Sequence, residues 1–311
     1  NSIYRINITT GVEETIHANG MTPGFTSNVK THSLAADGKG NVYFTYHDSN
    51  GGVYKVDKNS RVTLIAGGKG DASNYSDDGS GNQINLKNPS GITLDSDGNI
   101  VISEHHRIRK IENKPFNSQI VSNSSNYSLT TESGQKYSGS LDGNKEKARF
   151  NVPTGMAYDS QNNLFIVDWK NKKIRKMTPN GDVSSYITGS DMPQNFGNFI
   201  PQDIGIDKFD NLYITSSDNQ GSCILKVSPQ KDILVWAGSC LNYRDDQYNS
   251  LPTNAYGANL RFKGLAGIAV DNISGDVYVI DMLLKSSVGG GSYRKGVIYK
   301  LQNHMIQGGN P

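Results

Sequence analysis

Four acidic residues end short apolar runs in this sequence, and they are the first candidates for chemistry. The runs end at Glu104, Asp168, Asp218 and Asp281, and Trp169 directly follows Asp168. Carboxylates gathered in a ring would supply the roughly six to eight oxygen ligands that Ca²⁺ prefers. An acid that recurs in copy after copy of a repeat also caps the adjoining loop, by accepting backbone N–H groups. We expect the capping role, and ligand or Ca²⁺ binding is the alternative.

Asp203 occupies a place where three other copies of the same segment have glycine. The segments GITLD, GMAYD and GIAVD begin with Gly91, Gly155 and Gly267, whereas the segment DIGID begins with Asp203. A carboxylate at that place needs a ligand or a hydrogen-bond donor, which glycine does not. Asp203 is therefore the leading candidate for contact with a ligand.

The remaining polar residues do not assemble a recognisable catalytic set. His105 and His106 are adjacent, but a zinc site needs three or four ligands, and no third His or Cys lies at motif spacing. No nucleophile-elbow sequence is present, although a Ser-His-Asp triad is assembled in space and stays open as an alternative. We expect no catalytic residues and no cofactor, with Ca²⁺ the exception considered above.

The elements that position these residues repeat along the chain. The motif IRKM at 174 has five relatives: IYRI at 3, VYKV at 53, IRKI at 108, ILKV at 224 and IYKL at 298. A second motif precedes most of them: NVYF at 41, NIVI at 99, NLFI at 163, NLYI at 211 and DVYV at 276. An apolar run such as GITLD or GIAVD stands before each second motif. The chain is therefore built from repeated units.

Each unit predicts four antiparallel strands. GITLD is nearly all apolar, as in a strand buried on both faces, and SDGN supplies a tight turn. RIRKI alternates apolar and basic residues, and TPNG forms a second turn before the closing strand DVSSYIT. Several twisted four-stranded sheets around an axis bury one another's faces. The sequence therefore predicts an all-β fold, a β-propeller.

The motif count predicts a six-bladed propeller that forms a single domain over residues 1–311. Six copies of the third strand stand against five of the first two, so the first blade is incomplete in this chain. Its third and fourth strands lie in IYRINITTGVEETIHA, and HMIQ at 304–307 supplies a fourth strand for the last blade. An upstream segment, a partner, or a blade that stays half-built would account for the missing strands.

The stretches NPSGITLDSDGNIVISEHHRIRKI and VPTGMAYDSQNNLFIVDWKNKKIRKMTPNGDV resemble NHL repeats. The resemblance covers nearly the whole chain and implies a mostly six-bladed propeller family. It does not identify a function, because this fold hosts enzymes, RNA binders, sensors and adhesion modules. The family includes an amidating lyase, and similar folds include lactonases, which hold a metal in the central channel. This sequence shows no matching set of metal ligands. A metal-dependent lyase or hydrolase at the channel mouth is therefore kept as the alternative to a binding function.

Loop lengths predict which side of the propeller carries function. Turns between first and second strands are short, and the long insertions fall at 67–88, partly at 112–151, at 238–263 and at 282–296. These insertions are expected on the side where second strands end and first strands begin. Long loops on a rigid scaffold often bind ligands. We expect Asp203 and Trp169 on the same side.

Cys223 and Cys240 stand at opposite ends of one predicted hairpin. If its turn is centred between Gln230 and Lys231, Cys223 faces the neighbourhood of Gly238, and Cys240 lies two residues further on the same side. A slight splay brings the Cα atoms within the roughly 4.4–6.8 Å that a disulfide requires. Two separate buried thiols are the alternative. Because disulfides persist in oxidising compartments, we expect a secreted, periplasmic or extracellular protein.

Charge and hydropathy exclude several partner classes. Lys and Arg number 31 and Asp and Glu number 29, so the net charge of +2 gives little attraction for nucleic acid. The longest clean apolar run, at 265–270, is far shorter than the ~20 residues of a membrane-spanning helix. The sequence therefore predicts a binding module for a protein or glycan partner, without nucleic-acid binding or membrane insertion.

Overall fold

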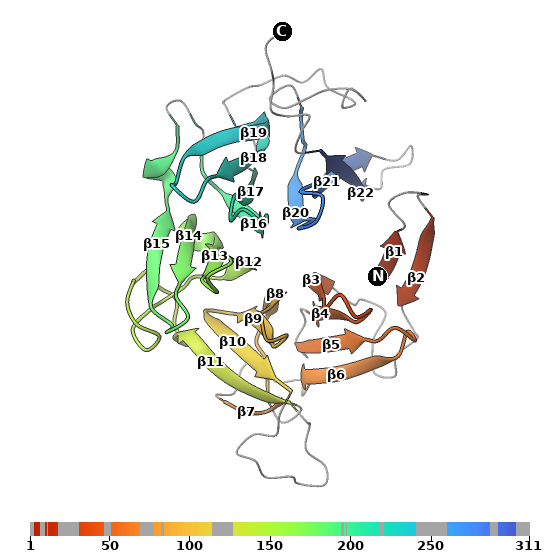
Figure 1. Cartoon of the computed structure of the whole chain (residues 1–311), viewed down its shortest axis with the longest axis vertical. Coiled ribbons are helices and arrows are strands. Elements are labelled where there is room, and N and C mark those ends of the chain that lie inside the picture. Colours follow the sequence, from red (N-terminus) through yellow and green to blue (C-terminus); the bar gives the residue numbers. More distant parts are fainter. Residues whose placement is uncertain are drawn as a thin grey trace. The chain divides into compact units, whose positions relative to one another are not determined.

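The computed structural model consists of antiparallel β-sheets joined by turns and loops (Figure 1). It describes residues 3–6, 10, 12–17, 31–46, 51–68, 78–81, 84–113, 127–193, 196, 198–217, 221–240, 260–286 and 292–302. The chain divides into two compact units, Asn1–Pro153 and Thr154–Pro311, and each is described by itself. In the described residues no helix is long and apolar enough to span a membrane.

The first unit holds a two-stranded sheet and two larger sheets. The two-stranded sheet consists of β1 (Ile3–Ile6) and β2 (Glu13–His17). The next sheet consists of β3 (Thr31–Ala36), β4 (Val42–Tyr46), β5 (Gly52–Val56) and β6 (Val62–Gly67). The third consists of β8 (Pro89–Leu94), β9 (Ile100–Glu104), β10 (Arg107–Glu112) and β11 (Ser128–Gly134), with the short β7 (Gly79–Ser80) paired to the outer edge of β11.

The second unit holds three sheets with the same strand order. The first consists of β12 (Pro153–Tyr158), β13 (Leu164–Asp168), β14 (Lys173–Met177) and β15 (Val183–Ile187), with the 3₁₀ turns η3 (Trp169–Asn171) and η4 (Gly189–Asp191). The second consists of β16 (Pro201–Ile206), β17 (Leu212–Ser217), β18 (Ser222–Val227) and β19 (Ile233–Ser239). The third consists of β20 (Leu265–Val270), β21 (Val277–Ser286) and β22 (Ser292–Leu301).

A repeated aspartate shapes the turn between first and second strands. Asp95 Oδ1 accepts the backbone N–H groups of Asp97 and Asn99, at 3.0 and 2.8 Å, and its Oδ2 accepts the Asn99 side-chain amide at 2.9 Å. The same Asp and Asn pair closes the turns at 37–41, 159–163 and 207–211. This side-chain cap fixes each hairpin locally, which explains why the repeat keeps both residue types.

Apolar side chains from successive sheets pack against one another within each unit. In the first unit Val53 and Ile65 pack with Ile92 and Ile102. In the second unit β13 and β14 contribute to one cluster with β16–β18, and β17–β19 contribute to another with β20–β22. Burying one Ile or Leu side chain stabilises the fold by about 1.5–3 kcal/mol. Face-to-face packing of sheets is therefore the main source of stability.

The predicted six blades are wrong as a count, because the described residues form five. The five are the sheets β3–β6, β7–β11, β12–β15, β16–β19 and β20–β22. The sixth sheet is the β1–β2 hairpin, which has no inner strands among the described residues. Ile3 of this hairpin is buried against Phe44 and Val56. The fourth strand expected at 304–307 lies outside the described residues.

Two of the predicted insertions have a different structure or place. The insertion at 282–296 is largely strand, because β21 and β22 pair from Val277↔Leu301 to Ser286↔Ser292. The long connection between β10 and β11 joins a third strand to a fourth, so it belongs to the side of the short turns. The expectation that every long insertion lies on one side is therefore wrong. Residues 114–126 and 241–259 lie outside the described residues.

Candidate functional site

Asp203 lies on β16, between the first strands of the two neighbouring blades. Its Oδ1 accepts the backbone N–H of Ile204 at 2.9 Å, and its Oδ2 accepts the N–H of Ile268 on β20 at 3.0 Å. Its own N–H donates to Thr215 Oγ1 at 3.0 Å. The half-buried carboxylate therefore joins β16 to β20 and finds donors in the protein.

Glycine at the equivalent place in β12 makes room for this carboxylate. A Cβ on Gly155 would overlap Asp203 Oδ1, whereas a Cβ on Gly267 would lie 3.6 Å from Oδ2. Asp203 therefore fills space that its neighbour leaves by lacking a side chain. The sequence signal, an acid where other copies have glycine, identified a real feature, and its contact with a ligand remains a prediction.

The environment of Asp203 favours the protonated carboxyl. Burial raises its pKa to about 6, although the N–H groups of Ile268 and Ile204 act in the opposite direction. A carboxyl with this pKa exchanges its proton close to neutral pH. Such a group is suited to acid–base work or to a pH response, provided that a reacting group approaches it.

Glu104, at the end of β9, is fully buried and engaged within its own blade. Its Oε2 accepts from Arg109 Nη1 at 2.6 Å and from Arg107 Nη2 at 3.0 Å. Its Oε1 accepts the backbone N–H of Lys87, two residues before β8, at 2.8 Å. Arg109 also lies 3.5 Å from Asp78. Glu104 thus fastens the connection that leads into its blade.

Asp168 and Asp281 hold the equivalent place in two other blades and are also fully buried. Asp168 Oδ2 accepts from Arg175 Nη1 and from Asn171 Nδ2, both at 2.8 Å. Asp281 Oδ1 accepts the backbone N–H groups of Lys263 and Gly264 at 3.0 and 2.7 Å. The contacts of Asp281 agree with the capping role expected from the sequence, whereas these contacts of Asp168 are with side chains.

Asp218 was placed in this series by the sequence, but the strand register assigns another residue. Ser216 follows Thr215 on β17 as Glu104 follows Ser103 on β9, and Asp218 lies outside the described residues. The described residues hold no group of three or more His, Cys, Asp or Glu side chains placed to bind one metal ion.

Trp169 begins η3 directly after β13. Its half-buried ring packs against the cluster that includes Val167 and Phe199, and the ammonium of Lys170 lies 4.2 Å from the ring centroid. A cation over an indole ring is weakly stabilising at an exposed site. Trp169 is thus partly a packing residue, and its exposed portion remains a candidate for ligand contact.

His105 and His106 form the tight turn between β9 and β10. His105 adopts a φ of 53°, and the two ring centroids lie 3.7 Å apart. His106 Nδ1 accepts the backbone N–H of Val152 at 3.3 Å, which ties this turn to the start of β12. Burial, together with nearby His106, Lys87 and Arg107, lowers the pKa of His105 to about 4. These contacts support a structural role for the pair.

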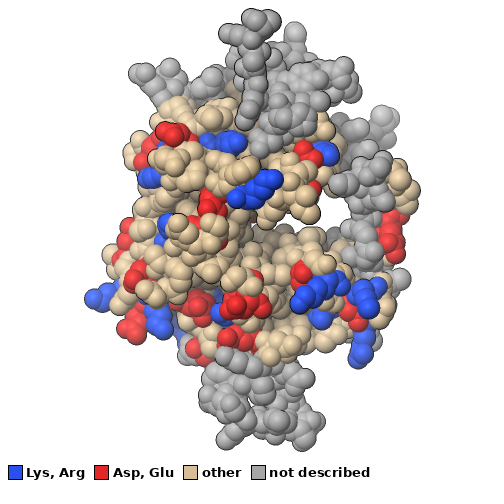
Figure 2. All heavy atoms as spheres, viewed as in Figure 1, with Lys and Arg blue, Asp and Glu red and all other residues tan. Residues whose placement is uncertain are grey.

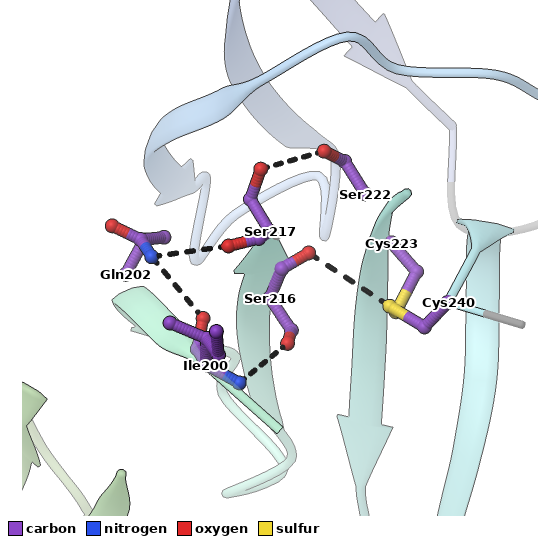
Figure 3. The surroundings of a disulfide bond; sticks show 7 residues. All are labelled: Ile200, Gln202, Ser216, Ser217, Ser222, Cys223 and Cys240. Atoms are coloured by element: carbon purple, nitrogen blue, oxygen red, sulfur yellow. Dashed lines mark hydrogen bonds between the residues drawn. A yellow bond between two sulfur atoms is a disulfide. The ribbon is translucent and has the colours of Figure 1, made fainter. Parts of the chain in front are cut away.

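The two cysteines form the predicted disulfide (Figure 3). Cys223 pairs with Gly238 across β18 and β19, as expected, and the Cα atoms of Cys223 and Cys240 lie 5.4 Å apart. Cys240 Sγ lies 3.8 Å from the Ser216 carbonyl oxygen, and Ser216 Oγ accepts the Ile200 N–H at 3.1 Å. The disulfide thus closes the outer hairpin of β18 and β19, beside β17.

Sequence reasoning overlooked the details of one ordered connection, residues 135–152, between β11 and β12. Gly139 N–H donates to the Phe150 carbonyl, and Arg149 N–H donates to the Leu141 carbonyl, each at 3.0 Å. Phe150 is fully buried and anchors the connection, whereas Tyr137 is 76% exposed and Leu141 is 55% exposed. The signal available in the sequence was Tyr137, an aromatic residue in an insertion that is otherwise rich in polar residues and glycine.

Comparisons with known proteins establish the fold class only. No family model matches the chain. It is 29% identical over 114 residues to Protein SUPPRESSOR OF QUENCHING 1, chloroplastic, of Arabidopsis thaliana, which covers 36% of this chain. That stretch is 10% of the relative, so the chain spans about a tenth of the curated relative it matches.

Two solved structures share its architecture at low sequence identity. One is a protein of unknown function from Bacteroides thetaiotaomicron VPI-5482, with a TM-score of 0.59 and 16% identity over 96% of this chain and 64% of that chain. The other is a catalytically inactive virginiamycin B lyase from Staphylococcus aureus, with a TM-score of 0.52 and 16% identity over 99% and 78%. The chain is a β-propeller with four-stranded antiparallel blades. Membership of the NHL-repeat family stays a prediction.

Proposed function

We propose that this β-propeller is a secreted or cell-surface binding module that recognises a protein or glycan partner. The binding side is the one where second strands end and first strands begin, which includes the connection 135–152. The observation that carries the proposal is this connection, because backbone hydrogen bonds order it while Tyr137 and Leu141 stay exposed. An exposed aromatic side chain on a rigid element loses little entropy on binding.

The disulfide supports an extracytoplasmic location. Cys223 and Cys240 close a hairpin with a sequence separation of 17. Disulfides form and persist in oxidising compartments and are rare in the cytosol. A secreted, periplasmic or extracellular protein meets this condition, and we propose that location here.

A metal-dependent lyase or hydrolase is the second candidate, and Asp203 is the observation that favours it. Its carboxyl lies on a first strand and has a pKa raised by burial to about 6, which suits a general base. Both of its oxygens already accept backbone N–H groups, and Glu104, Asp168 and Asp281 are held within their blades. Binding without chemistry therefore accounts better for these contacts, with no required cofactor and Ca²⁺ as the alternative.

We further propose that β1 of the β1–β2 hairpin pairs with two inner strands that a longer chain or a partner supplies. The support lies on β3, whose Leu34 is 58% exposed although it pairs with the fully buried Phe44. Two inner strands placed beside β1 would cover that side chain. A structure of a longer chain, or of a complex, tests this, and strands that leave β1 unpaired on that edge would contradict it.

The binding proposal is tested by probing glycan and protein arrays with two matched variants. Tyr137→Ser with Leu141→Ser removes the exposed apolar pair on the proposed side. Phe209→Ser with Ile273→Ser removes an exposed pair, 66% and 88% accessible, from the short-turn side. Loss of array binding in the first variant alone is expected, whereas loss in the second alone would contradict the proposal.

Metal analysis of the purified protein separates binding from catalysis. A stoichiometric transition metal, together with turnover of a lactone that Asp203→Asn abolishes, would establish the enzyme instead.

A further inference from the structure

The connection 135–150 brings two arms of backbone side by side. Hydrogen bonds join Gly139 to Phe150 and Leu141 to Arg149, so the arm with Tyr137 and Leu141 runs beside the arm with Lys147. Ala148 and Phe150 are fully buried and hold the second arm against the blades. The exposed side chains therefore project from a framework that is ordered before any ligand arrives.

Arg149 is placed by contact with Gly139. A Cβ on Gly139 would lie 2.7 Å from Cδ and 2.8 Å from Cβ of Arg149, so only glycine lets this side chain lie across the first arm. The close approach of Gly139 and Arg149 therefore holds the two arms against each other.

The connection carries a local positive charge. The connection has four basic and two acidic residues: Lys136, Lys145, Lys147 and Arg149, and Asp142 and Glu146. Its net charge of +2 equals the net charge of the whole chain of 311 residues. Lys145 and Lys147 are exposed. On the face drawn in Figure 2 basic and acidic groups are interspersed. An anionic ligand is therefore favoured at this connection over a neutral one.

The size of the connection favours a short polymer segment over a protein as its ligand. A stable protein–protein interface buries about 800 Å² on each side and needs roughly 20–30 residues. A connection of 16 residues that exposes one Tyr and one Leu is smaller than that, and it suits a few sugar rings. The C–H faces of sugar rings pack against aromatic rings, while acidic substituents accept hydrogen bonds from Lys and Arg.

We infer that the connection 135–150 binds a short segment of an anionic polysaccharide. Tyr137 and Leu141 contact the ring faces, and Lys145 and Lys147 meet the carboxylate or sulfate groups. The inference rests on the proposed binding function of this side and names the ligand class for it.

The test is affinity electrophoresis of the folded protein in native gels that contain polygalacturonate, dextran sulfate or neutral dextran. We expect retardation by the two acidic polymers and none by dextran. Tyr137→Ala should raise the apparent Kd by about tenfold, as expected for loss of an aromatic contact, and Tyr137→Phe should leave it within about twofold. Lys145→Gln with Lys147→Gln should raise it by a similar factor, and more salt should weaken binding.

The matched control removes equal charge from the short-turn side, by Lys58→Gln with Arg61→Gln in the β5–β6 turn, and should leave the Kd unchanged. Equal losses in both double variants would show a non-specific charge effect and overturn the inference. No retardation of the wild-type protein by either acidic polymer would also overturn it, as would stronger binding of a poly-glutamate peptide that depends on Tyr137. The array experiment tests the proposed binding function separately. If a protein partner bound on the array, that function would be supported even though the polysaccharide inference had failed.

Discussion

Two neighbouring blades fasten the same end of their strands by different chemistry. In the blade β12–β15, Asp168 and Arg175 form a fully buried ion pair at 2.8 Å. In the blade β16–β19 the repeat places Ser216 and Leu225 at those positions, and Leu225 packs in the apolar cluster. That blade instead carries the Cys223–Cys240 disulfide across its outer hairpin.

The difference shows that the repeat requires closure of this end and not a particular interaction. A buried ion pair contributes little net stability because desolvation offsets the attraction, but leaving one partner alone is costly. A disulfide acts mainly by restricting the unfolded chain and needs no partner in the core. An apolar residue beside a serine and a covalent bond thus replace the ion pair.

Breaking the ion pair on one side should give the largest effect. Arg175→Leu leaves Asp168 buried without its cation, and we expect a loss of about 3–5 kcal/mol in the free energy of unfolding. Adding Asp168→Ser reproduces the neighbouring blade and should restore most of that loss. Urea denaturation of the two variants measures this, and a double variant as unstable as the single one would refute the comparison.

Opening the disulfide should have the next largest effect. Reduction is expected to cost about 2–4 kcal/mol, because the closed loop no longer limits the unfolded ensemble. Thermal unfolding with and without reductant measures the change. The variant Cys223→Ala with Cys240→Ala serves as control and should not respond to reductant. Two reactive thiols in the unfolded, unreduced wild-type protein would show that the bond is absent.

The blade β16–β19 has Asp203 in its first strand where the blade β12–β15 has Gly155. This difference should make the free energy of unfolding depend on pH. The pKa of Asp203 in the folded chain, about 6, lies above its ordinary value of 3.8, so folding favours the protonated carboxyl. Its stabilising contribution is present below pH ~3.8 and is lost as pH rises through ~6. Because the side chain is half-buried, we expect a loss on the order of 1 kcal/mol.

Unfolding free energies of the wild type and of Asp203→Asn between pH 4 and 7.5 measure that contribution. The stability of the wild type relative to the variant should fall across this range. A difference that stays constant, or rises, with pH would contradict the raised pKa.

The smallest effect is expected for the link between the two blades at their short turns. Ser160 N–H donates to Asp210 Oδ1 at 2.8 Å and Ser160 Oγ–H donates to Asp210 Oδ2, and both residues lie at the surface. A double-mutant cycle of Ser160→Ala and Asp210→Asn should give a coupling energy below about 0.5 kcal/mol. Asn is chosen because it tolerates the φ of 61° at this position. A coupling well above 1 kcal/mol would make these turns a principal inter-blade contact.

Local patterns predicted the hairpins well. SDGN forms the tight turn that its residues indicated, and Cys223 faces Gly238 in the register expected from the turn position. Hydrogen bonds within four residues and a strand period of two decide these features, and both are properties of the chain itself. The capping of a loop by Glu104 was accessible for a different reason, because an acid recurs at the end of several second strands.

Aligning the repeats predicted strand ends and equivalent residues less well where strand lengths differ between blades. The residues 282–296 continue β21 and β22 instead of forming a loop, and Ser216, not Asp218, stands at the place of Asp168. Both errors arise because cross-strand pairing, which sets where a strand ends, depends on the partner strand. The exposure of Tyr137 likewise follows from how Phe150 anchors its connection.

The sequence by itself determined that this protein is a β-propeller of repeated antiparallel sheets, that tight turns close its hairpins, and that its two cysteines pair. These follow from period, turn chemistry and spacing, which act over a few residues. Tertiary structure alone decided that Asp203 bridges β16 and β20 in the space left by Gly155, and that Arg149 lies across Gly139. Such contacts join segments distant along the chain, and only the packing of sheets and connections brings them within hydrogen-bonding or van der Waals distance.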